Sequence, residues 1–486
     1  MIREYSDEAY AGMLEKLFVR FPSFQKVGGQ AYKPGIDHMV FFDQLAGHPH
    51  RKYATVHIAG TNGKGSVSNM LASALAASGL RTGLYTSPHI HDFRERMRLL
   101  DGRTGAERPE YITKEEVWDF IRKWHSTFDH LDLSFFEITT MMAFSWFAAR
   151  EVDVAVIETG LGGRFDSTNV ISPVLSIITN IGLDHCDMLG NTLPEIAFEK
   201  AGIIKPKTPV VVGESDPETD PVFERKVLYT NLPEPGYMGD RQKIMSLLTF
   251  ADRTVPTLWP QKDILLKNMD LQGSYQPKNL RTVLAALDIL ASDDLTAAHP
   301  LFSGLSRLWH HDDGSFSDGL PANAIVSAIE HTASRMDFHG RWEKICGNPL
   351  TIADIGHNAH GLKYNFSLLE QYRKEGVCTD IIIVYGVAAD KDVESIFPLM
   401  PDDAEYIFTN AAGRRALPAD ILLERYEKFR ADTGSGPASA RSSGSVSEAV
   451  AMAISRADEI RRMNPDAKPL VYIGGSTFVV SEALPK

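Results

Sequence analysis

Residues 57–66 read His-Ile-Ala-Gly-Thr-Asn-Gly-Lys-Gly-Ser, a pattern suited to binding the phosphates of a nucleotide. An apolar run at 55–59 predicts a strand, and apolar residues at helical spacing predict a helix over 66–78. Glycines in the turn leave backbone N–H groups facing phosphate oxygens, and the helix N-terminus adds positive charge. Lys64 is placed to reach the β- and γ-phosphates, and Ser66 to hold Mg²⁺. The other turn residues assigned to the nucleotide are Gly60, Thr61, Asn62, Gly63 and Gly65.

The turn departs from the commonest phosphate-binding pattern at one position. That pattern has glycine where this chain has Ile58, and the first glycine here is Gly60, so the loop is a shorter variant. An ordinary strand-to-helix turn is the alternative interpretation. Glycine, lysine and a hydroxyl at the positions that the phosphate-binding mechanism needs favour nucleotide binding.

Two further groups follow predicted strands at their carboxyl ends. Glu158 ends a strand predicted over 152–158, and His185 follows a strand predicted over 174–179. The carboxyl ends of parallel strands meet at one edge of a sheet, so both side chains are expected beside the phosphate loop as metal ligands. The alternatives are a strand-end acid that faces water and a structural histidine.

Other candidate groups have ordinary interpretations on residue type alone. Ser87 lies in a Ser-Pro turn, and Lys200 is near a helix end, where it stabilises the helix dipole. The apolar surroundings of Lys200 also predict partial desolvation, which makes a lysine amine reactive. In the second half of the chain, Arg341 is suited to binding phosphate through two N–H groups, and Asp354 to accepting from a ribose hydroxyl.

Composition bounds the classes of function. The chain has 486 residues, 43% of them apolar and 23% charged, which is typical of a globular protein with two domains. A net charge of -13 argues against nucleic acid held on a basic surface, so small-molecule partners are expected. Three cysteines without paired spacing fit a reducing compartment. The polar N-terminus is unlike a signal peptide and no apolar run is long enough to cross a bilayer, so we expect a cytoplasmic protein without membrane partners.

Apolar runs and helical patterns alternate along the chain, which predicts an α/β fold with parallel sheets covered by helices. The segment 291–324 interrupts this alternation, so we predict an insertion there and a domain boundary near residue 292. The predicted domains are 1–292 and 293–486, with a flexible loop over 431–444. Further strands are predicted over 209–213, 350–355, 381–385, 406–409 and 469–473, and helices over 115–128, 137–150, 193–202, 279–290 and 361–374.

Several motifs occur together in a fixed order, at 60–66, 86–89, 135–137, 160–169, 182–185, 199–205 and 386–392. With them the chain resembles the folylpolyglutamate synthase / dihydrofolate synthase family of the Mur-ligase superfamily, over about residues 32–475. The resemblance implies an N-terminal P-loop ATPase-like domain with a mostly parallel sheet and flanking helices. It also implies a smaller, Rossmann-like C-terminal α/β domain.

The resemblance implies roles for individual residues as well. Ser87 and Glu158 would hold one Mg²⁺ and His185 a second, for which Lys200 is carbamylated to supply a carboxylate. The complete metal set is Ser66, Ser87, Glu158, His185 and Lys200, and the catalytic set is Lys64, His185, Lys200 and Arg341. Further contacts with ATP are implied for Asn279, Arg341, Asp354 and His357. The implied pteroate-binding residues are Gly35, Ser134, Phe135, Phe136, Glu137, Phe165, Asp166 and Ser167.

One nucleotide motif departs from the family pattern. The family has Asp-Gly-Ala-His-Asn-Pro where residues 354–359 read Asp-Ile-Gly-His-Asn-Ala. The Asp, His and Asn remain, so the nucleotide role is retained while the turn geometry is left open.

The implied activity is ATP-dependent ligation of L-glutamate to dihydropteroate, to the glutamate tail of folates, or to both, through an acyl phosphate. Two alternatives stay open. The first is another Mur-type ligase acting on a cell-wall precursor, and the second is a nucleotide-dependent binding module akin to a switch protein. We expect a monomer. The sequence leaves open whether one or both ligase activities are present and whether K⁺ is required.

Overall fold

The computed structural model describes residues 5–22, 33, 35–232, 241–256, 262–305, 320–413, 415–435 and 439–485. The chain divides into two compact units: unit 1 comprises Met1–Asp270 and Gln276–Phe338, and unit 2 comprises Leu271–Tyr275 and His339–Lys486. The predicted boundary near residue 292 is therefore wrong. Helices after that residue pack on unit 1, where Ser73 Oγ donates to the backbone oxygen of Ala328 at 2.9 Å.

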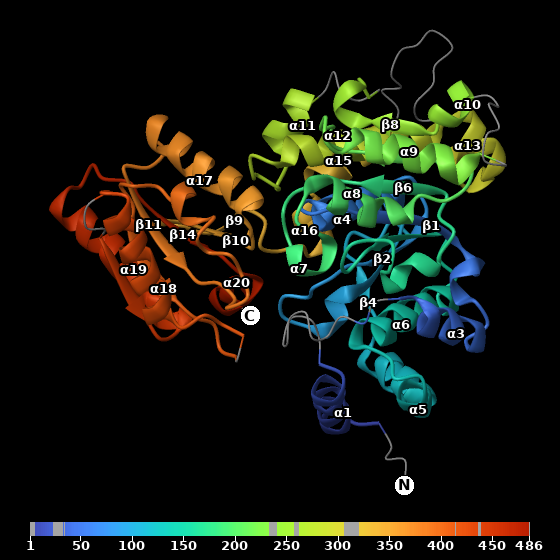
Figure 1. Cartoon of the computed structure of the whole chain (residues 1–486), viewed down its shortest axis with the longest axis horizontal. Coiled ribbons are helices and arrows are strands. Elements are labelled where there is room, and N and C mark those ends of the chain that lie inside the picture. The colour runs from blue at the N-terminus through green and yellow to red at the C-terminus, as the bar shows by residue number, and fades with distance from the viewer. Residues whose placement is uncertain are drawn as a thin grey trace. The chain divides into compact units, whose positions relative to one another are not determined.

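Unit 1 is built on an eight-stranded sheet in the order β4-β3-β2-β5-β1-β6-β7-β8 (Figure 1). The six strands from β2 to β8 in that order run parallel, while β3 and β4 add an antiparallel edge. The central strands are buried runs rich in Val and Ile, as expected where helices cover both faces. The strands are β1 (Ala54–Ala59), β2 (Arg81–Tyr85), β3 (Met97–Asp101), β4 (Glu110–Tyr111), β5 (Val154–Glu158), β6 (Leu175–Ile178), β7 (Val210–Val212) and β8 (Leu248–Phe250).

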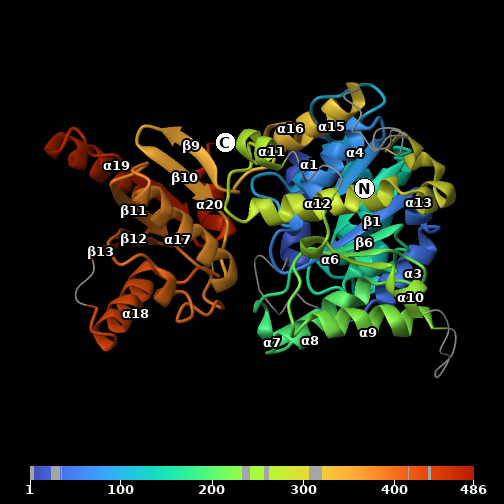
Figure 2. The same cartoon turned by 90° about the horizontal axis from the view of Figure 1, so that it is seen from above.

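Helix α4 (Lys64–Ala77), which follows the phosphate loop, is buried along nearly its whole length. It packs beside α12 (Gln276–Ala291) and α15 (Leu320–Glu330), as both Figure 1 and Figure 2 show. On the opposite face of the sheet, Ala155 and Ile157 join the apolar side chains of α5 (Lys114–His130) and α6 (Phe135–Ala149) in one core. Both of these helices begin with a capping box, which satisfies the free N–H groups of their first turns.

The remaining helices of unit 1 lie around this framework. The α-helices are α1 (Asp7–Arg20), α3 (Asp37–Leu45), α7 (Cys186–Leu189), α8 (Leu193–Lys200), α9 (Asp220–Asn231), α10 (Arg241–Met245), α11 (Lys262–Asn268), α13 (Asp293–Ala298) and α16 (Thr332–Met336). Short 3₁₀ helices are η2 (Pro49–Lys52), η3 (Phe93–Arg96), η4 (Ser167–Val170), η5 (Ala201–Ile203), η6 (Ala251–Arg253) and η8 (Pro300–Phe302).

Unit 2 has its own six-stranded sheet, in the order β13-β12-β11-β14-β10-β9. All neighbours pair in parallel except β9, which is antiparallel to β10. The strands are β9 (Glu343–Gly347), β10 (Leu350–Asp354), β11 (Asp380–Tyr385), β12 (Glu405–Thr409), β13 (Ala440–Ser443) and β14 (Pro469–Gly474). The helices are α17 (Ala359–Lys374), α18 (Ala419–Asp432), α19 (Val446–Met463), α20 (Thr477–Ala483) and the 3₁₀ turn η9 (Phe397–Leu399).

The structure corrects one loop prediction and adds detail to a second segment. The flexible loop predicted over 431–444 is largely ordered structure, since α18 extends to Asp432 and β13 pairs with β12; residues 436–438 lie outside the described part. The predicted insertion at 291–324 contains α13, η8 and the start of α15, and residues 306–319 lie outside the described part. The strand in the first segment could not be predicted, because β13 reads Ala-Arg-Ser-Ser and lacks an apolar alternation. The prediction of an insertion at 291–324 stays a prediction.

The predicted α/β class is confirmed, with two mostly parallel sheets flanked by helices. The predicted buried strands are present within one or two residues of their expected ends. Among the described residues, no helix is both long enough and apolar enough to cross a membrane.

Candidate active site

The phosphate loop forms the turn between β1 and α4, and its two structural glycines are required by close contacts. Gly63 has a φ of +81° at the N-terminus of α4, and a Cβ there would lie 2.4 Å from Asn279 Oδ1. Gly60 has a φ of +150°, and a Cβ there would lie 1.8 Å from Thr179 Oγ1. No other residue fits either position, because both the backbone conformation and the space demand glycine. The predicted nucleotide residue Asn279 is thus held directly against the loop.

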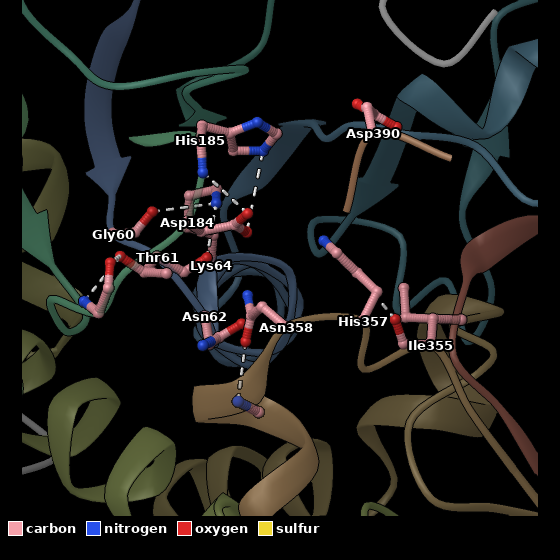
Figure 3. Close-up of polar contacts among 12 residues, drawn as sticks. Gly60, Thr61, Asn62, Lys64, Asp184, His185, Ile355, His357, Asn358 and Asp390 are labelled. Carbon is pink, nitrogen blue, oxygen red and sulfur yellow. Dashed lines mark hydrogen bonds and ion pairs between the residues drawn. The ribbon is translucent and has the colours of Figure 1, made fainter. Parts of the chain in front are cut away.

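Two lysines converge on the carbonyl of Gly60. Lys64 Nζ donates to this oxygen at 3.0 Å and to the Thr61 oxygen at 3.1 Å (Figure 3). Lys200 Nζ, at the end of α8, donates to the same Gly60 oxygen at 2.9 Å. Burial and, to a smaller extent, the nearby charge of Lys64 lower the pKa of Lys200 to about 7. The turn is therefore a positive centre with a readily deprotonated amine, where phosphate oxygens and carboxylates are favoured.

The predicted metal ligands at the ends of β2 and β5 lie beside each other. Glu158 pairs in register with Ile58, and its side chain is 3% exposed. The backbone N–H of Ser87 donates to Glu158 Oε2 at 3.3 Å. Ser66, in the first turn of α4, is also buried and accepts a hydrogen bond from Gln276 Nε2 at 3.4 Å. Three oxygen-bearing side chains thus come from elements that meet at the carboxyl edge of the sheet.

His185 lies after β6, at the same edge, and begins α7 with a φ of +53°. Its Nε2 is 3.8 Å from Asp184 Oδ2, and its backbone N–H donates to Asp184 Oδ1 at 2.9 Å (Figure 3). The charge of Asp184 opposes the fall in the pKa of Lys200, so these groups interact electrostatically. The sequence argument assigned His185 to this site and gave no role to Asp184.

Residues at the end of β6 support the phosphate loop, and the sequence argument missed them. Asn180 Oδ1 accepts from the Asn62 N–H at 2.9 Å, and Thr179 Oγ1 donates to the Asn62 oxygen at 2.6 Å. The Thr61 hydroxyl bonds the backbone of Gly182 in both directions, donating to its oxygen at 3.1 Å and accepting from its N–H at 3.0 Å. The sequence pattern could have identified Thr179 and Asn180, since polar residues at the end of the same buried strand also identified His185.

Asp166, a predicted substrate residue, is fully engaged within its own loop. Its Oδ2 accepts from the N–H groups of Gly160 and Leu161, each at 2.8 Å. Its Oδ1 accepts from the N–H of Thr168 at 3.0 Å and from the Thr168 hydroxyl at 2.5 Å. That hydroxyl is in turn 2.8 Å from Nε2 of the buried His57 on β1. Asp166 therefore shapes the glycine turn after Glu158, and its contact with substrate stays a prediction.

The imidazole of His57 is neutral in this network. Burial lowers its pKa from 6.5 to about 3, and the charge of Lys205 acts in the same direction. Because the Thr168 hydroxyl donates its hydrogen bond to the Asp166 carboxylate, the His57 Nε2–H is the group that donates to the Thr168 oxygen. A buried chain of hydrogen bonds thus connects β1 to the turn that follows β5.

The predicted pteroate segment at the start of α6 divides into capping and aromatic residues. Ser134 and Glu137 form a capping box: Glu137 Oε2 accepts from the Ser134 N–H at 2.7 Å, and Ser134 Oγ from the Glu137 N–H at 3.2 Å. Phe135 is buried in the core, 5.3 Å below the guanidinium of Arg96. Phe136 lies against Gly160, where a Cβ would come within 2.6 Å of its ring. Phe136 is therefore the member of this segment that borders the glycine turn.

The other predicted substrate residues are partly exposed. Phe165 stacks under the guanidinium of Arg164 at 4.3 Å, and Ser167 begins η4. Gly35 has a φ of +111° just before α3, with nothing near its Cβ direction. Roles of these three in substrate binding stay predictions.

Two buried arginines next to this site escaped the sequence argument. Arg96 is 3% exposed and its Nε donates to His89 Nδ1 at 2.8 Å; Arg98 is also 3% exposed and donates to Thr86 Oγ1 at 3.2 Å. Burial lowers the pKa of both, while the charge of Glu158 acts in the opposite direction. Both arginines lie in a segment rich in charged residues. Such a segment normally predicts a surface exposed to solvent, so its pattern gave no sign that they are buried.

The predicted nucleotide residues of the second half belong to unit 2. Asp354 ends β10 and is 2% exposed. Its carboxylate accepts from the Tyr275 hydroxyl at 2.6 Å, the Trp342 N–H at 2.8 Å, the Gly356 N–H at 2.8 Å and Asn365 Nδ2 at 2.7 Å. These four donors fill the acceptor positions of a carboxylate, so a ribose contact requires one of them to leave.

Arg341 and His357 flank the same carboxyl end of β10. Arg341 donates to the Gly340 oxygen at 3.2 Å, and His357 Nδ1 is 3.0 Å from the oxygen of Ile355 (Figure 3). Asn358 caps the N-terminus of α17 by accepting from the Gly361 N–H at 2.8 Å. The carboxyl edge of the unit 2 sheet thus presents a guanidinium, an imidazole and a helix N-terminus, groups suited to an anion.

Known proteins are similar to this chain in both architecture and sequence. The Mur ligase middle domain matches residues 58–287. The dihydrofolate synthase/folylpolyglutamate synthase of Bacillus subtilis (strain 168) is 32% identical over 376 residues, which cover 75% of this chain and 78% of that protein. The folylpolyglutamate synthase of Lacticaseibacillus casei is 31% identical over 359 residues, covering 71% and 74%.

A solved structure agrees over the full length. The crystal structure of Mycobacterium tuberculosis folylpolyglutamate synthase, complexed with ADP and AMPPCP, superposes with a TM-score of 0.73 at 25% identity and covers 98% of each chain. The structural superposition covers nearly all of both chains, and the two relatives align with about three-quarters of this chain. The chain belongs to the family of folylpolyglutamate synthases and dihydrofolate synthases.

Proposed function

We propose that this chain is an ATP-dependent ligase that joins L-glutamate to dihydropteroate and to the glutamate tail of folates. The observation that carries the proposal is the pair of lysines on one backbone oxygen. Lys64 and Lys200 both bond the Gly60 carbonyl, one from the phosphate loop and one from α8. A nucleotide switch needs only the first lysine. A second, buried lysine whose pKa is lowered favours a ligase in which this lysine, once carbamylated, would hold an additional metal ion.

Relatives support both halves of the activity. The B. subtilis protein carries both names, dihydrofolate synthase and folylpolyglutamate synthase, and so does that of Mycobacterium tuberculosis, which is 29% identical over 443 residues. The M. tuberculosis crystal structure was obtained with ADP and AMPPCP, so its site takes an adenine nucleotide. We extend ATP use and both acceptors to this chain as parts of the proposal.

The donor groups fit Mg²⁺ on the evidence of their chemistry. The hydroxyls of Ser66 and Ser87 and the buried carboxylate of Glu158 are oxygen ligands, which Mg²⁺ prefers. His185 and a carbamylated Lys200 would hold a second ion. When bound, such ions neutralise phosphate charge and polarise the phosphoryl group that is transferred.

Carbamylation of Lys200 is chemically accessible in this structure. The reaction needs the neutral amine, whose lone pair attacks CO₂ to give a carbamate and release one proton. Because burial lowers the pKa of Lys200 to about 7, a large fraction of its amine is neutral at physiological pH. The product carboxylate would neutralise the charge of Lys64, which now faces Lys200 across one carbonyl oxygen.

The reaction then follows from positioning and charge. An oxygen of the acceptor carboxylate attacks the γ-phosphorus of ATP and ADP leaves, which yields an acyl phosphate. The amine of L-glutamate attacks the acyl carbon, phosphate departs, and the nitrogen loses a proton. Lys64 stabilises the negative charge on the transferring phosphoryl group, and Arg341 is proposed to bind nucleotide phosphate through its guanidinium. Phe136 and the glycine turn at Gly160 are proposed to border the pteroate ring.

Isotope transfer tests this chemistry directly. The full chain is supplied with Mg·ATP, L-glutamate and dihydropteroate labelled with ¹⁸O in its carboxylate, and the released phosphate is analysed by mass spectrometry. The proposal predicts one ¹⁸O atom in each phosphate released, because the acyl phosphate transfers an acceptor oxygen. Phosphate without label would contradict the acyl-phosphate route. Labelled turnover of a cell-wall nucleotide precursor, with none of dihydropteroate, would favour the other Mur-type ligases.

A further inference from the structure

Three side chains meet between the end of α3 and the start of β1, remote from the phosphate loop. Asp43 is 4% exposed and His50 5% exposed, and the side chain of His48 is about one-third exposed. Asp43 Oδ2 is 2.6 Å from His48 Nδ1 and 3.2 Å from His50 Nε2. All three potential ligand atoms lie within 4.8 Å of one another.

The backbone helps to bring the three residues together. His48 adopts a left-handed conformation with a φ of +54°, and its backbone N–H donates to the Asp43 oxygen at 2.9 Å. The rings of His48 and His50 are almost perpendicular, at 89°, and both direct a nitrogen at the same oxygen. The three side chains that could coordinate a metal ion are therefore already close together in this structure.

One buried carboxylate oxygen of the cluster has no hydrogen bond within the described part of the chain to offset its loss of hydration. Asp43 Oδ1 is buried and has no hydrogen-bond partner among the described residues. The cluster borders an apolar side chain, since the centres of the His50 and Phe144 rings are 5.8 Å apart. A buried carboxylate oxygen without a partner costs free energy, and an ion at this position would remove that cost.

We propose that Asp43, His48 and His50 bind one divalent transition-metal ion of the zinc class. Two imidazole nitrogens and one carboxylate oxygen are ligands that Zn²⁺ prefers, and Mg²⁺ disfavours nitrogen. The exposed side of His48 gives the ion an entry path and leaves a fourth position for water. The ion would connect the end of α3 to η2, at the start of the strand that carries the phosphate loop at its other end.

This site is separate from the proposed Mg²⁺ sites. Its ligands precede β1, whereas the phosphate loop follows that strand of six residues, a separation of roughly 20 Å at about 3.3 Å per residue. The ion therefore stabilises unit 1 and takes no part in ligation.

Zinc binding to the full chain tests the proposal. The protein is stripped with a chelator, incubated with Zn²⁺, desalted and analysed for bound metal. The compared variants are His48→Ala, Asp43→Asn and, as a matched control on the surface of α5, His125→Ala. All are prepared in a His185→Ala background, which removes a nitrogen ligand from the proposed ligase site.

We expect the His185→Ala parent and the His125→Ala control to retain one bound Zn²⁺ per chain after desalting. The His48→Ala and Asp43→Asn variants should lose this ion. Zn²⁺ should also raise Tm by at least about 2 °C only where the site is intact. Because His48 is partly exposed, its replacement is expected to leave the fold unchanged by circular dichroism. Equal Zn²⁺ content in His48→Ala and its parent would overturn the proposal and leave the cluster as a hydrogen-bonded clip.

Discussion

Gly63 shows how strictly the phosphate loop is specified at single residues. Gly63→Ala would place a methyl group 2.4 Å from Asn279 Oδ1 in a backbone conformation that alanine rarely adopts. We expect kcat/KM for ATP to fall by about 100-fold or more, since the loop can no longer present its N–H groups. Steady-state kinetics with varied ATP measures this loss.

Gly79 provides the matched control for that change. It follows the same helix with a φ of +95°, and nothing lies within 4 Å of its Cβ position. Gly79→Ala is expected to lower the free energy of unfolding by about 1–2 kcal/mol, the same backbone cost that Gly63→Ala carries. The value of kcat/KM for ATP should be retained in Gly79→Ala. Equal losses of activity in the two variants would mean that backbone strain, and not the contact with Asn279, matters.

The amine of Lys200 makes activity dependent on pH. Its pKa is lowered to about 7, so the neutral form that reacts with CO₂ predominates above pH 7, and its share falls from about half at pH 7 to about one-tenth at pH 6. We expect turnover to decline as the pH falls from 7 to 6 and to be partly restored by added bicarbonate.

Carbamylation can be observed directly with ¹³C-bicarbonate. A carbamate carbonyl signal in the ¹³C NMR spectrum should be lost in Lys200→Ala. It should persist in Lys205→Ala, which removes a partly buried lysine whose pKa burial also lowers, to about 8. A carbamate signal that survives in Lys200→Ala would assign the modification elsewhere.

At the scale of elements, the turn after β5 depends on the chain from Asp166 through Thr168 to His57. Thr168→Val keeps the shape of the side chain and removes the hydroxyl that joins them. The free energy of unfolding should fall by about 1–3 kcal/mol, because buried polar groups lose their partner. We also expect kcat to fall, because the turn adjoins Glu158; denaturant unfolding and kinetics measure the two effects.

Thr168→Ser retains the hydroxyl and is the rescue variant. It should recover most of the lost stability and kcat, apart from the cost of a missing methyl group. Failure of Thr168→Ser to recover either quantity would assign the loss to packing, and the hydrogen-bonded chain would then have no role in positioning the turn.

Much of this site could be predicted at the level of elements. Buried strands followed by glycine or polar residues identified Glu158 and His185, because the carboxyl ends of parallel strands meet at one edge. The capping roles of Ser134 and Glu137 were also readable, since Ser-x-x-Glu before an apolar run forms a capping box. Arg96 and Arg98 could not be identified, because only tertiary packing buries a run of alternating charges.

At the scale of the whole molecule, the chain passes between the two units more than once. Residues Leu271–Tyr275 belong to unit 2, although the segments on both sides belong to unit 1. The boundary predicted near residue 292 differs from this division because polar composition marks a loop but does not show on which unit the helices after it pack. The hydroxyl of Tyr275 fastens this segment to Asp354 at 2.6 Å.

Tyr275→Phe tests that attachment. The variant should lower the stability of unit 2 by about 1–3 kcal/mol, because Asp354 loses one of its four donors in a buried setting. Hydrogen exchange should therefore accelerate in β10 and its neighbours while β1 stays protected. The control is Ser274→Ala in the same segment, which removes only an exposed hydrogen bond to the Tyr364 oxygen. Equal acceleration in β1 and β10 would show that the effect is global.

The central claim is acceptor-dependent ligation by this chain, and ADP release measures it most directly. The purified full chain is assayed with Mg·ATP and L-glutamate, with dihydropteroate or tetrahydrofolate added separately. Each acceptor should stimulate ADP release, and Lys200→Ala should abolish the stimulation. ADP release that neither acceptor changes would contradict the claim.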